Sequence, residues 1–135
     1  MKLIQWTDEL STGIKKIDDE HKKFLGLLNT SNRLVRAKKY KALNKQLPDL
    51  FSYAKTHFST EEDLFEKYNY PFSNEHKNEH LQLLEKTITF YDDAKNGKNV
   101  GEDLMDFLKD WFQNHLKKHD FKYTKYFQKN KIKVE

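Results

Sequence analysis

The chain has 135 residues, of which 34% are charged and 36% are hydrophobic, and its formal net charge is +4. This length suits one domain that buries roughly two-thirds of its unfolded surface. The absence of cysteine excludes disulfides, thiolate metal sites, iron–sulfur clusters and thiol catalysis, so any metal must be held by imidazole and carboxylate groups.

Residues 1–17 show no periodicity and are expected to form an N-terminal arm with three apolar anchors: Trp6, Ile14 and Ile17. No stretch here or later has an apolar run long enough for a signal peptide or a transmembrane span. We therefore expect a cytoplasmic protein with no membrane insertion. A single domain over residues 1–135 is predicted, with its helical bundle at residues 18–130.

Only 4 Gly and 2 Pro punctuate the chain, and apolar residues recur with the helical period in four stretches. The first helix is predicted to begin near Asp18, which serves as its N-cap. Gly26 within this helix indicates the close approach of a neighbouring element. The second helix runs from about Tyr40 to Lys67, where Pro48 predicts either a kink or a separate preceding turn.

The third predicted helix covers about residues 74–95, with Gly97 as its C-cap, and the fourth starts near Val100. Short connections between the helices imply antiparallel neighbours. The expected fold class is therefore all-α, an up-down-up-down antiparallel four-helix bundle. After the fourth helix we expect an irregularity at residues 116–120, followed by a short C-terminal helical stub at residues 121–129.

Histidines and acids fall on the apolar stripes of the predicted helices. The set comprises His21, His57, Glu61, His76, His80, His115 and Asp120. Two pairs lie four residues apart, a spacing that places both side chains on one helical face. His115 and Asp120 are five apart and can share a site only through the expected irregularity. Because buried unpaired carboxylates are costly, acids in such a core indicate a metal.

Five imidazoles and two carboxylates exceed what one tetrahedral zinc ion takes. They suit two octahedral ions bridged by the carboxylates and by an oxide or hydroxide, an arrangement that leaves one coordination position open. Mixed imidazole and carboxylate ligation favours iron, with zinc, manganese or cobalt as substitutes. An open position on a redox-active metal pair in an apolar bundle indicates a small diatomic ligand.

Two other metal designs do not match the spacing. The ferritin-like bundle needs a Glu three residues before a His, and the nearest approximation is Asp18 before His21. The zinc protease motif His-Glu-x-x-His is absent. The sixth histidine, His119, lies one turn from His115, and we interpret it as solvent-facing rather than as a second-shell group or a rival ligand.

Charged residues off the apolar stripes are interpreted as solvated surface groups. Four acids belong to this set: Glu62, Asp63, Glu75 and Glu79. Three lysines near the C-terminus have the composition of a nucleic-acid or anionic-lipid contact: Lys129, Lys131 and Lys133. A solvated, frayed tail is the favoured reading, so no nucleic-acid partner is expected.

The pattern resembles the hemerythrin family, in particular the single-domain bacteriohemerythrins, over nearly the whole chain. The motifs that carry the resemblance are Ile4-Gln5-Trp6, Ile17-Asp18-x-Glu20-His21, His57-Phe58-x-x-Glu61-Glu62, Tyr70-Pro71, His76-x-x-Glu79-His80, Trp111-x-x-x-His115 and Asp120. Two positions depart from the family pattern. Phe65 stands where a methionine is common, and Phe112 stands where a smaller aliphatic residue is familiar.

The resemblance implies two iron ions bridged by oxide or hydroxide. One six-coordinate iron would be held by His76, His80 and His115. A second, five-coordinate iron would take O2 and would be held by His21 and His57. The bridging carboxylates would be Glu61 and Asp120. Four apolar side chains lie near the open iron by helical spacing and form the expected ligand pocket: Phe24, Leu25, Phe58 and Phe112.

The leading interpretation is a non-enzymatic protein that binds O2 reversibly, for oxygen carriage, storage or delivery. One rival is an enzyme or scavenger that consumes peroxide or NO at the same site. Another is a module that senses O2, iron or redox state through a separate partner. A stable oxy form favours the first, turnover the second and a ligand-dependent partner the third. A monomer is the default expectation.

Overall fold

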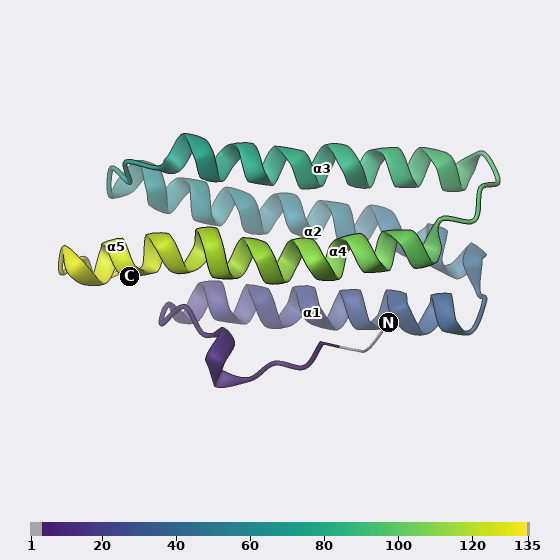
Figure 1. Cartoon of the computed structure of the whole chain (residues 1–135), viewed down its shortest axis with the longest axis horizontal. Helices are drawn as coiled ribbons and strands as arrows, with labels where there is room; N and C mark the ends of the chain where they lie inside the picture. The colour runs from purple at the N-terminus through teal and green to yellow at the C-terminus, as the bar shows by residue number, and fades with distance from the viewer. Residues whose placement is uncertain (1–3, 135) are drawn as a thin grey trace.

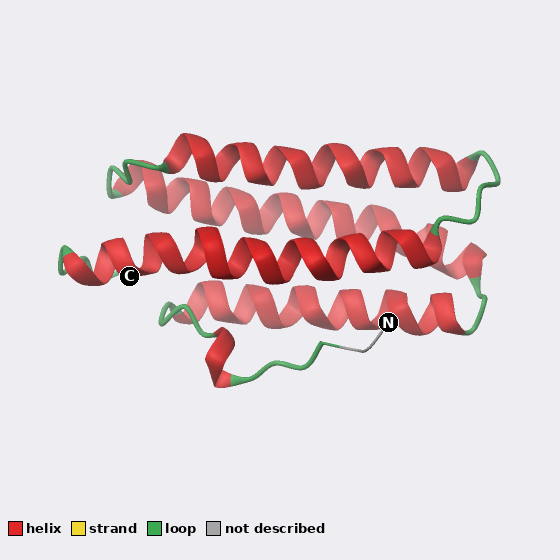
Figure 2. Cartoon of the chain, in the orientation of Figure 1, coloured by secondary structure: helices red, strands yellow, loops and turns green. Residues whose placement is uncertain are grey.

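The computed structural model describes residues 4–134, and within this range every regular element is helical. Four long helices lie side by side along the long axis of the molecule (Figure 1), and no strand appears between them (Figure 2). Consecutive helices pack on each other, and the first also packs on the fourth. The all-α, up-down-up-down four-helix bundle predicted from the sequence is confirmed.

The elements follow one another with short connections. In chain order they are η1 (Asp8–Leu10), α1 (Lys15–Arg36), α2 (Tyr40–Lys67), α3 (Ser73–Lys95), α4 (Gly101–His115), η2 (Leu116–Asp120) and α5 (Phe121–Lys129). α2 continues unbroken through Pro48, so the residues before the proline do not form a separate turn. Gly97 has a φ of +85° just after α3, a backbone conformation that glycine adopts without steric cost at a helix end.

α1 begins at Lys15, three residues before the predicted start, and Asp18 is not its N-cap. The Asp18 carboxylate instead accepts hydrogen bonds from the Thr12 backbone N–H and hydroxyl, both at 2.8 Å, and from the Ser11 hydroxyl at 2.5 Å. The prediction was wrong because this side chain ties the N-terminal arm to the first turn of α1. A negative charge there also complements the helix dipole.

Two hydrophobic clusters fill the bundle. The larger runs through the middle and far end of the four helices, and Trp6 of the N-terminal arm packs against it. The smaller cluster, which we call the aromatic cluster, consists of Phe65, Tyr70, Tyr123 and Phe127 at the end that carries α5. Ile132 and Val134 pack against it. The prediction of a frayed C-terminal tail was therefore wrong. None of the described helices is long and apolar enough to cross a membrane.

Gly26 makes no close approach to a neighbour, contrary to the sequence interpretation. A Cβ atom added there would have nothing within 4 Å. We expect Gly26→Ala to raise the free energy of unfolding by about 0.8 kcal/mol, because alanine is the better helix former. Gly101→Ala is the matched control, since its Cβ would lie 3.1 Å from Val35. Denaturant unfolding measures both, and an unchanged midpoint for Gly26→Ala would contradict the expectation.

Candidate metal centre

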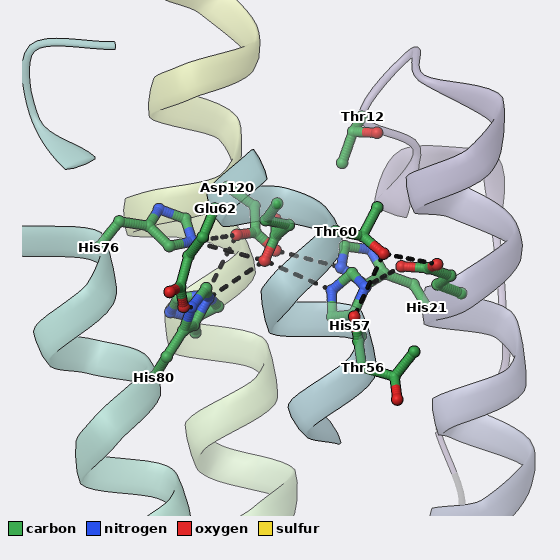
Figure 3. Close-up of polar contacts among 12 residues, drawn as sticks. Thr12, His21, Thr56, His57, Thr60, Glu62, His76, His80 and Asp120 are labelled. Atoms are coloured by element: carbon green, nitrogen blue, oxygen red, sulfur yellow. Dashed lines mark hydrogen bonds and ion pairs between the residues drawn. The ribbon is translucent and has the colours of Figure 1, made fainter. Parts of the chain in front are cut away.

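The seven predicted metal-binding residues meet inside the bundle, where Phe65 and Tyr123 of the aromatic cluster contact His76. Figure 3 shows five of the seven: His21, His57, His76, His80 and Asp120. They comprise His21 on α1, His57 and Glu61 on α2, His76 and His80 on α3, His115 ending α4 and Asp120 ending η2. Each of these residues is at most 5% exposed. The bundle therefore gathers five imidazoles and two carboxylates in its interior, drawn from every one of the four long helices or its extension.

The irregularity predicted at residues 116–120 is a π-helical turn, η2. The Phe121 backbone N–H donates to the Leu116 carbonyl, a hydrogen bond that spans five residues. In this wider turn, residues five apart lie one above the other. His115 and Asp120 therefore face the same site, with the His115 Nε2 atom 3.1 Å from the Asp120 Oδ1 atom.

The imidazoles form two groups that share Glu61. On one side, the ligand-type atoms of Glu61, His76, His80 and His115 lie within 4.8 Å of one another. On the other side, the atoms of His21, His57 and Glu61 do the same. A Glu61 oxygen lies 3.1 Å from His80 Nε2 and 3.4 Å from His57 Nε2. Glu61 thus stands between the two groups.

Asp120 also lies between the two groups of imidazoles. Its Oδ2 atom is 3.2 Å from His21 Nε2 on one side, and its Oδ1 atom is 3.1 Å from His76 Nε2 on the other (Figure 3). A carboxylate that turns one oxygen to each group has the arrangement needed to bridge two ions.

The polar atoms of the site are poorly satisfied by one another. Within the described residues, six buried ligand atoms or ring nitrogens have no hydrogen-bond partner: His21 Nδ1, Glu61 Oε2, His76 Nε2, His115 Nδ1, His115 Nε2 and Asp120 Oδ1. Several of these atoms nevertheless lie about 3.1 Å from one another, for example Asp120 Oδ1 and His115 Nε2. Two ligand atoms on adjacent corners of one octahedral ion are separated by a similar distance, roughly 3 Å for metal–ligand bonds of about 2.1 Å. Atoms that approach this closely without hydrogen-bond geometry fit a shared cation.

The electrostatics of the site point the same way. Burial and the neighbouring Asp120 oppose ionisation of Glu61, yet His57, His76 and His80 outweigh them and hold the pKa of Glu61 well below its usual range. Burial opposes protonation of His76, but the nearby carboxylates of Asp120 and Glu61 raise the pKa of His76 to about 9. In the metal-free protein, protons therefore supply the positive charge that a metal would otherwise bring.

Two carboxylates that the sequence did not assign to the site orient its histidines. Glu20 Oε1 lies 2.6 Å from His57 Nδ1, and Glu62 Oε2 lies 2.8 Å from His80 Nδ1. These contacts turn the Nε2 atom of each ring toward the site, as outer-sphere carboxylates do for metal-binding histidines. The interpretation of Glu62 as a solvated surface charge was wrong, because its partner lies on the neighbouring helix.

Glu62→Ala is expected to weaken metal binding roughly 10- to 100-fold, the usual effect of losing an outer-sphere partner. The matched control is Asp63→Ala, which removes an exposed carboxylate from the adjacent position. Competition against a chelator measures both affinities. Equal affinity for the two variants would show that Glu62 does not orient His80.

A small apolar cavity borders the His21 and His57 side of the site. It encloses about 10 Å³, at the lower limit of the space one water molecule needs. Its walls include Phe24, Phe58 and Phe112 of the predicted pocket, together with Ala54 and Trp111. Leu25 is buried in the larger hydrophobic cluster and does not line this cavity. The Phe112 ring stacks on Phe24 and meets His21 edge-on, both at 5.5 Å between centroids.

His119 is partly buried rather than fully solvated. Its side chain is 24% exposed, and its Nε2 atom lies 3.0 Å from Glu79, so neither residue is the free surface charge that the sequence indicated. The His119 ring stacks on His115 with 5.4 Å between centroids and 22° between planes. His119 is absent from both groups of converging ligand atoms.

Tyr123 of the aromatic cluster is a further buried group beside the site. Its ring lies 5.5 Å from His76, and its hydroxyl has no hydrogen-bond partner among the described residues. Burial, together with the negative charges of Glu61 and Asp120, raises the pKa of Tyr123 well above its usual value. This phenol stays neutral and does not line the apolar cavity.

Comparison with known proteins agrees with this geometry. The family model of the hemerythrin HHE cation binding domain matches residues 12–127. A bacteriohemerythrin of Pseudomonas paraeruginosa is 31% identical over 124 residues, which cover 92% of this chain and 81% of that protein. A hemerythrin-like protein of Naegleria gruberi is 33% identical over 120 residues, which cover 87% of this chain and 88% of its own length.

Solved structures show the same architecture. The crystal structure of a wild-type hemerythrin superimposes with a TM-score of 0.85 at 29% identity, over 91% of this chain and 96% of that one. A second solved structure, that of a leucine-to-phenylalanine mutant, superimposes with a TM-score of 0.86 at 30% identity, over 92% of this chain and 96% of that one. The family model covers most of the sequence, and the matching bundle encloses a cluster of buried histidines and carboxylates that could hold a metal, so this chain belongs to the hemerythrin family.

Proposed function

We propose that the chain is a non-enzymatic di-iron protein that binds O2 reversibly, for oxygen carriage, storage or delivery. The observation that carries this proposal is the placement of two carboxylates, Glu61 and Asp120, between two unequal groups of imidazoles. His76, His80 and His115 would hold one iron, and His21 and His57 the other. Both imidazoles of the smaller group line the apolar cavity, whereas His115 is the one imidazole of the larger group that does so.

The iron pair, with its bridging oxide or hydroxide, would supply reversible electron transfer to a bound diatomic ligand. The protein's own residues would set how that ligand is held. Glu20 and Glu62 orient one histidine on each side of the site. Phe24, Phe58 and Phe112 keep the cavity apolar and close to the smallest volume that one water molecule needs.

Among the described residues, the walls of the cavity offer no free general acid, because the three histidines that line it are proposed metal ligands. Asp120 is the one carboxylate among its walls, and its assigned role is to bridge the metals. Neighbouring imidazoles, His115 first among them, overcome the effect of burial and hold the pKa of Asp120 well below its usual range, so it carries no proton to donate. Cleavage of the O–O bond is assisted by proton donation. A cavity without a donor therefore favours release of intact O2 over reduction.

The deciding experiment is an anaerobic reduction followed by O2 titration with visible spectroscopy. We expect an absorbing oxy form that returns to the colourless diferrous state when the solution is purged with inert gas. Irreversible oxidation at first exposure, or steady peroxide or NO consumption with added reductant, would assign the protein to the enzyme class instead. Association with another protein only in one ligand state would favour a sensor.

A further inference from the structure

The end of the bundle that carries α5 includes a lysine-rich segment. Residues 117–133 contain seven lysines and a single carboxylate, Asp120, which is buried in the metal site. This segment alone is more positive than the net +4 of the whole chain. A comparable run of cations, at residues 33–45, lies at the opposite end of the bundle, away from the metal site. A dense local positive charge attracts an acidic partner.

Part of this charge forms a continuous surface, which we call the basic face: Lys118, Lys122, Lys125 and Lys129. All four side chains are exposed. Lys122 lies 3.6 Å from Glu75, whereas the other three form no ion pair with the described residues. Their spacing of three or four residues places them along one side of η2 and α5. They resemble the charged rim of a protein contact more than a set of internal salt bridges.

An exposed aromatic ring lies at the edge of the basic face. Phe72 is 41% exposed, and the Lys122 ammonium lies 3.7 Å from the centre of its ring. Large apolar side chains exposed to this degree are few in the described chain. An exposed aromatic ring beside a lysine is a typical composition for the edge of an interface with a partner of opposite sign.

The basic face also has a direct physical link to the metal centre. His119 follows Lys118 in the chain and is 24% exposed. Its ring stacks on the proposed iron ligand His115, and the opposite neighbour of His115 is Trp111, stacked at 4.3 Å and 12°. A partner docked on this face would therefore be separated from the iron-binding imidazole by one aromatic ring.

We propose that the basic face, with Phe72 and His119 at its edge, is the docking surface for an acidic one-electron donor protein that reduces the oxidised site back to its ferrous state. This inference rests on the proposed di-iron function. An O2-binding iron pair that oxidises must regain two electrons to return from two ferric to two ferrous ions. Each electron comes from one donor molecule, which is oxidised in turn, and no covalent bond to the donor forms. His119 is the contact through which electrons reach His115.

Flavodoxin, an acidic one-electron donor protein, is a suitable probe. Titration calorimetry at low ionic strength measures the binding of oxidised flavodoxin to the iron-loaded protein. In a second experiment, reduced flavodoxin is mixed with the ferric protein in a stopped-flow spectrometer. The test variant is Lys125→Glu/Lys129→Glu. The matched control, Lys41→Glu/Lys45→Glu, reverses two exposed charges at the start of α2, at the other end of the bundle.

We expect the test variant to show no calorimetric binding of flavodoxin. Its second-order rate constant for reduction by flavodoxin should be about tenfold lower than that of the wild type at low salt, and this difference should shrink as salt screens the charges. The control variant should behave like wild type. His119→Ala should retain binding but show a several-fold lower limiting rate of reduction. Dithionite, which needs no docking surface, should reduce all variants at similar rates.

Wild-type binding and reduction rates for the Lys125→Glu/Lys129→Glu variant would overturn the proposal. So would lysine-dependent binding to phosphatidylglycerol vesicles or duplex DNA in place of flavodoxin, which would assign the face to another partner. An unchanged limiting rate in His119→Ala would overturn the assigned electron route. The calorimetric result does not depend on O2, so failure of reversible oxygenation with intact lysine-dependent docking would reject the proposed function alone.

Discussion

Replacing Asp120 with alanine is expected to abolish binding of the metal pair and to lower the melting temperature by on the order of 10 °C at saturating iron. Asp120 is buried and lies within 3.2 Å of imidazole nitrogens from α1, α3 and α4. A ligand that binds only the native state at about 1,000 times its Kd stabilises that state by about 4 kcal/mol. Chelation of the wild type should produce a shift of similar size. Calorimetry and elemental analysis measure both effects.

The pH dependence of metal binding follows from His76. Its pKa of about 9 in the metal-free protein means that iron must displace a proton at neutral pH. The apparent affinity should therefore weaken as the pH falls, because imidazole binds a metal only when it is deprotonated.

His119→Ala is the control and should bind iron like wild type. A His119→Ala protein without iron, or a single zinc ion per wild-type chain, would contradict the ligand assignment.

Shortening Phe112 to alanine should speed decay of the oxygenated protein to the ferric state several-fold. The Phe112 ring is 4% exposed and closes the small cavity against His21 and Phe24. Its removal enlarges a cavity that already has about 10 Å³, so water can reach the open iron position. The decay is measured by visible absorption after addition of O2 to the diferrous protein.

A control must separate this effect from general loss of stability, since truncating a buried phenylalanine costs about 3–5 kcal/mol. Phe127→Ala removes a ring that is 2% exposed in the aromatic cluster, away from the cavity walls. It should destabilise the protein without faster decay. Phe112→Leu, which loses less volume, should lie between wild type and Phe112→Ala. Equal decay rates for Phe112→Ala and Phe127→Ala would show that Phe112 is not the lid.

Features of this protein that depend on local spacing could be read from the sequence. The apolar period gave α2 its bounds at Tyr40 and Lys67, because burial of one helical face is encoded every three or four residues. The spacing of four between His57 and Glu61 placed both on one face for the same reason. The five-residue spacing of His115 and Asp120 required a departure from the α-helix, and the π-turn η2 supplies it.

Features that depend on which helices become neighbours were decided by the tertiary structure. Glu62 and His80 are 18 residues apart and meet only because α2 and α3 pack together. Asp18 is a plausible N-cap by residue type, but its carboxylate is used by the N-terminal arm, so α1 begins earlier. The lysines of the basic face look like ordinary surface charges in the sequence, and only the course of η2 and α5 shows that they share one side of the helix. A periodicity argument describes one helix at a time, whereas hydrogen bonds between helices and the surfaces they form require the packed bundle.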